Sequence, residues 1–277
     1  MSRIHRVARS FSNSLGHESP VIKFFRPTYN CLLRWSSGER GLPQLLNGHE
    51  TFRIDPQHRK FFPEAYDPEV CAYLRERVKP NSVSLSVGAH FGIYALCLAT
   101  WSAPAGRVFA FEPNPYTRTV LQKHILFNNL GERVEIVPCA VSDTISEMAF
   151  FAATDLGGYS RLGQPNPDVA QEKHDAITTT VTTLDDFCRE RNLAPDWFVM
   201  DIEGYEIAAL AGARETIQAG RGRLGMIVEM HPNLWNTAGA SRNDLEMLLA
   251  EMSLKPVPMT GQKDPLAEYG LALLAYR

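Results

Sequence analysis

The chain has 277 residues, of which 44% are hydrophobic and 21% charged, a composition ordinary for a globular protein with room for one large α/β domain. Its formal net charge of −3 gives no sign of nucleic-acid binding, and no apolar run reaches the ~20 residues that a transmembrane helix needs. The five cysteines lack CxxC spacing, so we expect neither a disulfide framework nor a zinc knuckle. Free thiols suit a cytoplasmic protein.

The N-terminal part of the chain carries few local signals. We expect residues 1–60 to form a lead-in with helical character and residues 61–277 to form the main domain. The first 17 residues contain three arginines and no acid, which suits either a basic tail or a transit peptide. A short β segment is expected near Glu50–Ile54, and Phe61 and Phe62 are placed to pack the lead-in onto the main domain.

The stretch from Val83 to Glu112 predicts one strand–turn–helix–strand unit. An apolar β-branched run ends at Gly88, an apolar helix follows Gly92, and a second apolar strand ends at Glu112. A glycine turn lets the backbone approach a ligand closely and aims the amides of the helix N-terminus at it. An acid that closes the second strand can accept hydrogen bonds from a ribose diol. The unit therefore indicates a site for an adenosine-containing cofactor.

Strands and helices continue to alternate after this unit. The predicted strands are Val134–Val141, the pair Met148–Ala152 and Ile177–Thr183, then Trp197–Asp201 and Leu224–His231, and an antiparallel closing pair Lys255–Met259 and Tyr269–Tyr276. Helices are expected to begin after Asp67, Asn114, Thr183 and Ser241, each a suitable N-cap, and one alanine-rich helix is expected after the turn that contains Glu206. The long loop Asp155–Asp175 is expected to be functional or mobile.

This alternation predicts an α/β fold with a mostly parallel sheet and helices on both faces. In such sheets the ligand lies at the carboxyl ends of the strands, near the topological switch point. The residues that end the five core strands are therefore the candidates for a site: Gly88, Glu112, Val141, Asp201 and His231.

Five segments together resemble one family. The runs VGAHFGIYAL, VFAFEPNP, CAVSD, VMDIEGYE and MIVEMHP are similar to the FkbM-type S-adenosylmethionine-dependent methyltransferases. The resemblance implies a Rossmann-like, seven-stranded class I methyltransferase fold with antiparallel closing strands. It also implies S-adenosylmethionine as cofactor and methyl transfer, usually to a hydroxyl of a saccharide or secondary metabolite. On this basis the partner is a small-molecule or glycan acceptor rather than a nucleic acid.

The resemblance also implies the site residues. The turn formed by Gly88, Ala89, His90, Phe91 and Gly92 would wrap the methionine part of the cofactor. Glu112 would hold the ribose with Pro113 and Asn114 beside it, and the segment with Ala140, Val141 and Asp143 would flank the adenine, while Asp201 and Glu203 would lie at the floor of the reaction pocket. The family usually has an acid and an asparagine where this chain has Ser86 and His90. A catalytically weakened binding or scaffolding protein of the same fold is therefore an alternative.

The chemistry of the expected reaction requires a proton acceptor for the attacking hydroxyl. His231 is our candidate base, because an unperturbed imidazole titrates near pH 6.5, and Asp201 is the next candidate. We expect no metal site, although the carboxylates of Asp201, Glu203 and Glu229 offer an alternative to that expectation. A nicotinamide-dependent oxidoreductase shares the strand–turn–helix logic, but the turn reads GAHFG rather than GxGxxG.

Overall fold

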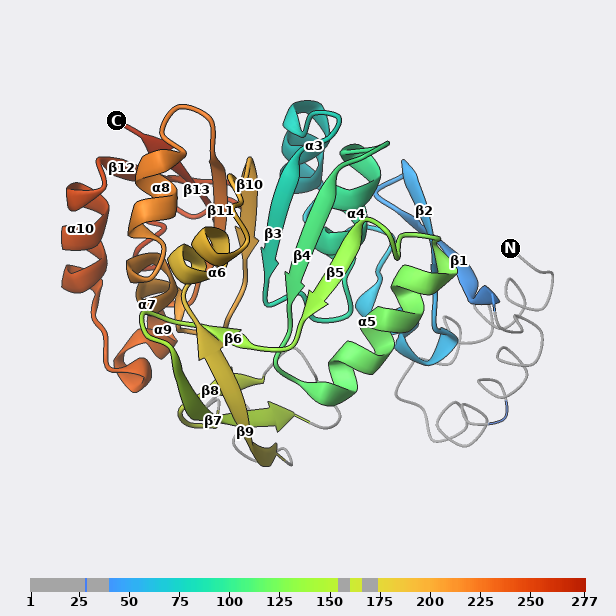
Figure 1. Cartoon of the computed structure of the whole chain (residues 1–277), viewed down its shortest axis with the longest axis horizontal. Coiled ribbons are helices and arrows are strands. Elements are labelled where there is room, and N and C mark those ends of the chain that lie inside the picture. Colours follow the sequence, from blue (N-terminus) through green and yellow to red (C-terminus); the bar gives the residue numbers. More distant parts are fainter. Residues whose placement is uncertain (1–27, 29–39, 154–159, 166–173) are drawn as a thin grey trace.

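The computed structural model describes residue 28 and residues 40–153, 160–165 and 174–277. Its centre is a seven-stranded sheet in the order β12-β13-β11-β10-β3-β4-β5 (Figure 1). These strands are β3 (Val83–Val87), β4 (Arg107–Phe111), β5 (Val134–Val137), β10 (Trp197–Met200), β11 (Gly225–Met230), β12 (Leu254–Pro258) and β13 (Gly270–Tyr276). Strands β5, β4, β3, β10 and β11 run parallel to one another, whereas β13 is antiparallel to both β11 and β12. The predicted fold class is confirmed.

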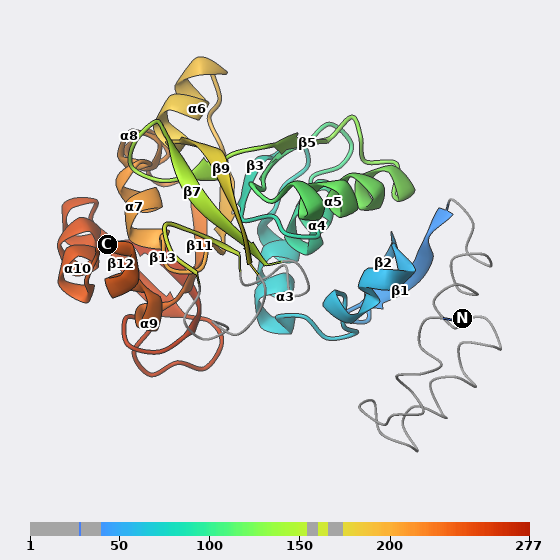
Figure 2. The same ribbon diagram turned by 90° about the horizontal axis from the view of Figure 1, so that it is seen from below.

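Helices cover both faces of this sheet because successive strand residues point to opposite sides. On one face Val108, Ala110 and Val199 are buried together with α3 (Pro68–Arg77), α4 (Ile93–Trp101) and α5 (Pro115–Phe127). On the other face Phe109 and Phe198 are buried together with α6 (Leu184–Glu190), α7 (Glu206–Ala211), α8 (Arg214–Ala219) and α10 (Arg242–Glu251) (Figure 2). The parallel strands thus lie in a closed apolar layer, which leaves their carboxyl ends for polar residues.

The expected strand Val134–Val141 is wrong as a single element. The structure divides it into β5 and β6 (Ala140–Val141), and β6 leaves the main sheet to pair with β9 (His174–Thr182). Pro138 lies at the break and has no N–H with which to continue a ladder. Strands β6 and β9 join β7 (Ser146–Ala153) and β8 (Arg161–Leu162) in a second, four-stranded sheet, which lies against the carboxyl ends of the main strands in Figure 1.

The N-terminal lead-in contains a hairpin of which only one strand was predicted. Strand β2 (Glu50–Ile54) occupies the expected place, and β1 (Leu42–Leu46) pairs with it antiparallel. The short helix η2 (Pro56–Phe61) follows, and Phe62 is buried in the cluster that also holds the hairpin residues Leu46 and Ile54. The predicted packing of Phe62 is therefore confirmed. The domain boundary near residue 60 stays a prediction.

Two expected helix starts differ in detail. Asp67 precedes α3 as predicted but has a left-handed φ of 38° and makes no capping bond with its side chain, which instead accepts a hydrogen bond from the Tyr94 hydroxyl at 2.8 Å. The single helix expected after residue 206 is two short helices, α7 and α8. Gly212 lies between them, and a Cβ there would fall 2.2 Å from the Ser142 carbonyl oxygen, so the chain bends where it meets the second sheet.

The other predicted helix starts and the predicted end of β11 agree with the structure. Asn114, Thr183 and Ser241 cap α5, α6 and α10 with their side chains, and Ser241 forms a capping box with Asp244. The short helix α9 (Pro232–Trp235) follows β11, so Pro232 ends the strand at the expected point. Within the described residues, no helix is long and apolar enough to cross a membrane.

Candidate active site

The glycine turn after β3 is packed against the end of β10. Gly88 and Gly92 have left-handed φ values of 77° and 98°, and so does His90 at 48°. A Cβ on Gly88 would lie 1.8 Å from the backbone oxygen of Asp201, so only glycine fits there. The amides of Gly88 and Ala89 both donate to the Phe111 carbonyl oxygen. The ends of three neighbouring strands, β10, β3 and β4, are therefore held together at this turn.

Glu112 lies at the end of β4 and is almost fully buried. Its two carboxylate oxygens accept hydrogen bonds from the amides of His90 and Asn114, each at 2.8 Å. Burial raises the pKa of Glu112 to about 7, even though these two hydrogen bonds favour the ionised form. Each oxygen keeps a second lone pair. A carboxylate fixed in this way by backbone amides can accept hydrogen bonds from a diol.

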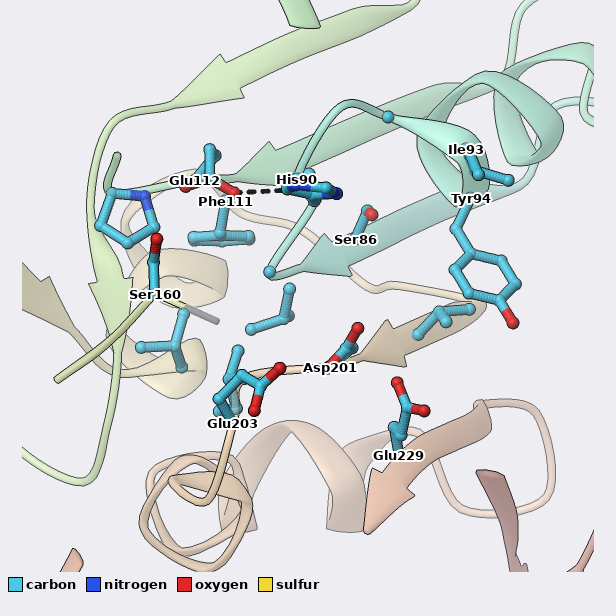
Figure 3. Close-up of a pocket in the computed structure, with 18 of the residues that line it drawn as sticks. Ser86, His90, Ile93, Tyr94, Phe111, Glu112, Ser160, Asp201, Glu203 and Glu229 are labelled. Carbon is cyan, nitrogen blue, oxygen red and sulfur yellow. Dashed lines mark hydrogen bonds between the residues drawn. The ribbon is translucent and has the colours of Figure 1, made fainter. Parts of the chain in front are cut away.

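A cavity of about 460 Å³ extends from Glu112 to the ends of β10 and β11, a volume within the usual range for small-ligand sites. Figure 3 shows Glu112 and His90 on one side of it and Asp201, Glu203 and Glu229 on the other. Among the residues that sequence predicted for the site, the lining contains Gly88, Ala89, His90, Gly92, Glu112, Pro113, Ala140, Val141, Asp201 and Glu203. Most of the predicted site is therefore brought together.

Four predicted residues are outside that lining. The Phe91 carbonyl accepts from His124 Nδ1 within the core, and Asn114 is occupied as the N-cap of α5 and as a donor to the Ser160 hydroxyl. Asp143 is exposed and accepts from Ser142. His231 is the fourth, and it lies directly behind the acidic side of the cavity. Their predicted roles stay predictions, and for Phe91 and Asn114 the contacts favour a supporting function.

We call Asp201, Glu203, Glu229 and His231 the acid–imidazole cluster. The imidazole Nε2 lies 3.9 Å from Asp201 Oδ1 and 3.8 Å from Glu203 Oε2. Burial and the neighbouring carboxylate of Glu229 raise the pKa of Asp201, and burial raises that of Glu203 to about 7. Burial alone would lower the pKa of His231, but Glu206, Asp201 and Glu203 outweigh it and raise it to about 10.

Glu206 is the functional residue that sequence reasoning misread. An acid in the first turn of a helix is usually exposed and interacts favourably with the helix dipole, yet the Glu206 side chain is fully buried. One oxygen accepts from the Gly204 amide at 2.8 Å and from His231 Nδ1 at 2.9 Å, while the other accepts from Trp235 Nε1 at 2.8 Å. A signal existed in the helical spacing, because the buried Ala209 and Leu210 follow three and four residues later.

Glu229 was named only as a possible metal ligand, and it proves to line the cavity beside Asp201. Asp201, Glu229 and His231 each offer one ligand atom, and these atoms lie within 4.8 Å of one another. In the long loop, Ser160 lines the cavity, whereas Arg161 is buried and donates to the Thr237 hydroxyl at 2.8 Å. Tyr159, also in this loop, lies outside the described residues.

The residues that are present fit an adenosine-containing cofactor. The glycine cradle admits no side chain, Glu112 presents a fixed acceptor, and the imidazole Nε2 of His90 is buried without a hydrogen-bond partner in the described structure. Ala140 and Val141, from the strand that leaves the main sheet, close the cavity beside Glu112. Ser86 lines the same cavity.

Comparisons with solved structures find related folds at low identity. A methyltransferase FkbM from Methylobacillus flagellatus KT is 18% identical over 71% of this chain, with a TM-score of 0.46, and the match spans 44% of that protein. The cofactor-bound protein Rv0187 from MTB is 15% identical over 97% of this chain and 94% of its own, with a TM-score of 0.45. A SAM-dependent O-methyltransferase from Thermotoga maritima is 14% identical, covers 76% and 65% of the two chains, and has a TM-score of 0.41.

No curated protein matches the chain. The family model for the methyltransferase FkbM domain, in contrast, matches residues 86–254, which is more than half of the sequence. The matched range runs from the glycine turn to the first closing strand and includes Glu112, Asp201 and His231. The chain therefore belongs to the FkbM methyltransferase family, and its cofactor is S-adenosylmethionine.

Proposed function

We propose that this methyltransferase transfers the methyl group of S-adenosylmethionine to a hydroxyl oxygen of a small-molecule acceptor, a saccharide or a secondary metabolite. The observation that carries the proposal is one cavity with Glu112 on one side and the carboxylates of Asp201 and Glu203 on the other. Glu112 would hold the cofactor ribose, with Ala140 and Val141 beside the adenine. The positively charged sulfonium would then face the acidic side.

The reaction needs a group that removes the hydroxyl proton. The acceptor oxygen forms a bond to the methyl carbon, the carbon–sulfur bond breaks, the sulfur leaves as a neutral thioether, and the proton must pass to a base. A positioned base contributes roughly 10²–10⁴-fold to the rate. We propose Glu203 for this role because its carboxylate lines the cavity, and most of the remaining rate would come from holding the two reactants in line.

We propose a role for His231 that differs from the role of base expected from the sequence. Its imidazole lies behind Asp201 and Glu203 rather than in the cavity lining, so we propose that it supports these carboxylates. A direct role of His231 as the base stays a prediction that the same kinetic experiment can test. The acidic lining also favours acceptors that are neutral at the reacting end, because a second anion would be repelled there.

Separate observations argue against the two alternative functions, an oxidoreductase and a scaffolding protein. The family match is to methyltransferases, which argues against a nicotinamide-dependent oxidoreductase. A scaffolding protein was suggested by Ser86 and His90, but the amide of His90 holds Glu112 and its backbone adopts the left-handed conformation of the turn. The departure at His90 thus leaves in place the geometry on which cofactor binding would depend.

Calorimetry with S-adenosylhomocysteine tests the cofactor part of the proposal. Glu112→Ala should weaken binding by roughly 10–100-fold, because a hydrogen bond to a charged group contributes about 1.5–3 kcal/mol. Glu132→Ala, at an exposed position away from the cavity, is the matched control and should bind like the wild type. Equal affinities in all three proteins would refute the role of Glu112.

Transfer of a labelled methyl group to a panel of sugars and hydroxylated metabolites tests the chemistry. With an accepted substrate, Glu203→Gln should lower kcat by at least ~100-fold with little change in cofactor affinity. A larger loss in His231→Gln than in Glu203→Gln would return the base role to His231. Methylation of nitrogen or carbon acceptors alone would overturn the proposed O-methylation.

A further inference from the structure

Three potential metal ligands converge at the ends of two adjacent parallel strands. Asp201 follows β10, and Glu229 and His231 lie at the end of β11, which pairs with β10 in register. One ligand atom from each lies within 4.8 Å of the other two. Ligand atoms that share one octahedral Mn²⁺ or Mg²⁺ ion stand roughly 3–4 Å apart, since each bond is about 2.1 Å long. Only small side-chain movements separate this arrangement from a coordination shell.

The orientation of His231 is the independent observation that points to a ligand. The residue is only 4% exposed, and its Nδ1 is bound by the buried carboxylate of Glu206. Its Nε2 faces Asp201 and Glu203 at 3.9 and 3.8 Å, beyond hydrogen-bond length. An imidazole whose Nδ1 is held by a carboxylate while Nε2 points into a set of oxygens is the usual arrangement of a metal-binding histidine.

The charge of the cluster favours a cation at the same point. The carboxylates of Asp201 and Glu203 lie within 4 Å of the His231 imidazole, and Asp201, Glu229 and His231 offer ligand atoms within 4.8 Å of one another. Burial of adjacent carboxylates is costly unless an opposite charge compensates them. Binding of a divalent ion through Nε2 would displace the imidazole proton, and the charge of the ion would then take the place of that proton beside the carboxylates.

We propose that Asp201, Glu229 and His231 bind one divalent cation of the Mn²⁺ or Mg²⁺ type, with Glu206 as the carboxylate that orients the imidazole. From the sequence we expected no metal, and the alternative was a metal site formed by Asp201, Glu203 and Glu229. In this proposal His231 takes the place of Glu203 as the third ligand, and Glu203 keeps its proposed role as the base. The catalytic consequence rests on the proposed function: the ion would hold the acceptor oxygen and make its hydroxyl more acidic.

Titration of the metal-stripped full-length protein with Mn²⁺, followed by electron paramagnetic resonance, tests the site without cofactor or acceptor. The wild type should bind one Mn²⁺ at sub-millimolar concentration. Glu229→Gln should weaken that binding by more than ~10-fold, and Glu206→Gln by roughly 10–100-fold through the loss of the orienting group. Glu132→Gln, at an exposed position far from the cluster in sequence, should bind like the wild type.

Circular dichroism of each variant without metal shows whether it is folded, and Asp201→Asn replaces any variant that is not. An anomalous difference peak in Mn²⁺-soaked crystals between Asp201, Glu229 and His231 would support the proposal directly. No binding by the wild type below 1 mM (an order-of-magnitude limit for a functional site), or equal binding by Glu229→Gln, would overturn it. Because binding is measured without turnover, failure of the proposed methyl transfer would not alter this result.

Discussion

At the scale of single residues, the buried side chain of Glu206 links the active site to the core. Its carboxylate is fully buried, yet three donors from Gly204, His231 and Trp235 satisfy it. Burial of a polar group is costly without such hydrogen-bond partners. Glu206 thus fixes the turn that carries Asp201 and Glu203 and the strand end that carries His231, so the position of the cavity-lining acids depends on a side chain that does not reach the cavity.

Gly88 is the residue whose substitution tests the close approach of strands β3 and β10. Alanine there would place a Cβ 1.8 Å from the Asp201 backbone oxygen at a left-handed φ of 77°. We expect Gly88→Ala to lower the free energy of unfolding by more than about 3 kcal/mol, because both backbones must move. Urea unfolding measures this change.

The control for this experiment is Gly131→Ala. Nothing lies within 4 Å of a Cβ at Gly131, and its φ is not left-handed, so its stability should stay within about 1 kcal/mol of the wild type. Equal unfolding curves for the two variants would contradict the close contact at Gly88.

At the scale of elements, the helices and strands that could be predicted from the sequence are those with a clear pattern of apolar residues. The five parallel strands and α5 have continuous or regularly spaced apolar residues, and this pattern is the most reliable local signal. Strand β1 was missed because Pro43 and Gln44 interrupt its apolar pattern, although Asn47-Gly48 is a hairpin turn signal. The run through Pro138 was misassigned because apolar periodicity alone gives no information on which sheet a strand joins.

The amide side chain of Asn128, the C-cap of α5, bonds to strand β2 of the hairpin. Asn128 accepts from the Arg53 amide at 2.8 Å and donates to the Arg53 carbonyl at 2.8 Å. Asn128→Ala should remove both bonds and lower protein stability by roughly 1–3 kcal/mol. It should also increase hydrogen exchange at the Arg53 amide, since the hairpin could then open locally.

Thr119→Ala is the matched variant on the same helix, because the Thr119 hydroxyl donates a hydrogen bond to the Pro115 carbonyl within α5. Its exchange at Arg53 should equal that of the wild type. Unchanged exchange in Asn128→Ala would mean that apolar packing of Phe52 and Ile54 holds the hairpin by itself.

At the scale of the whole molecule, the candidate site could be predicted as a set of strand ends but not as a geometry. Parallel strands end at one edge of the sheet, so Gly88, Glu112, Asp201 and His231 were expected together. Which of them line the cavity depends on side-chain directions and on the second sheet, which are set by contacts far apart in sequence. His231 and Glu206, 25 residues apart, illustrate this, because their hydrogen bond has no local signal.

The stability of the whole protein should depend on pH through buried histidines. His124 is fully buried, its Nε2 accepts from the Asp55 amide, and burial lowers its pKa from 6.5 to about 4. Because the unfolded chain binds the proton more tightly, this contribution is complete above pH 6.5 and is lost as the pH falls towards 4. Between pH 7.5 and pH 5 the loss amounts to about 2 kcal/mol. His90, whose pKa is lowered to about 3, acts in the same direction.

Other buried groups oppose this trend, so the decisive quantity is the difference between two proteins. The raised pKa of Glu112 makes its contribution more favourable as the pH falls below 7, and Asp55, whose pKa is lowered, contributes a loss only below about pH 4. His124→Gln should be less stable than the wild type at pH 7.5, but its further loss at pH 5 should be about 2 kcal/mol smaller. Urea unfolding of both proteins at the two pH values measures this difference, and equal losses would show that His124 is already protonated, or exposed, in the folded protein.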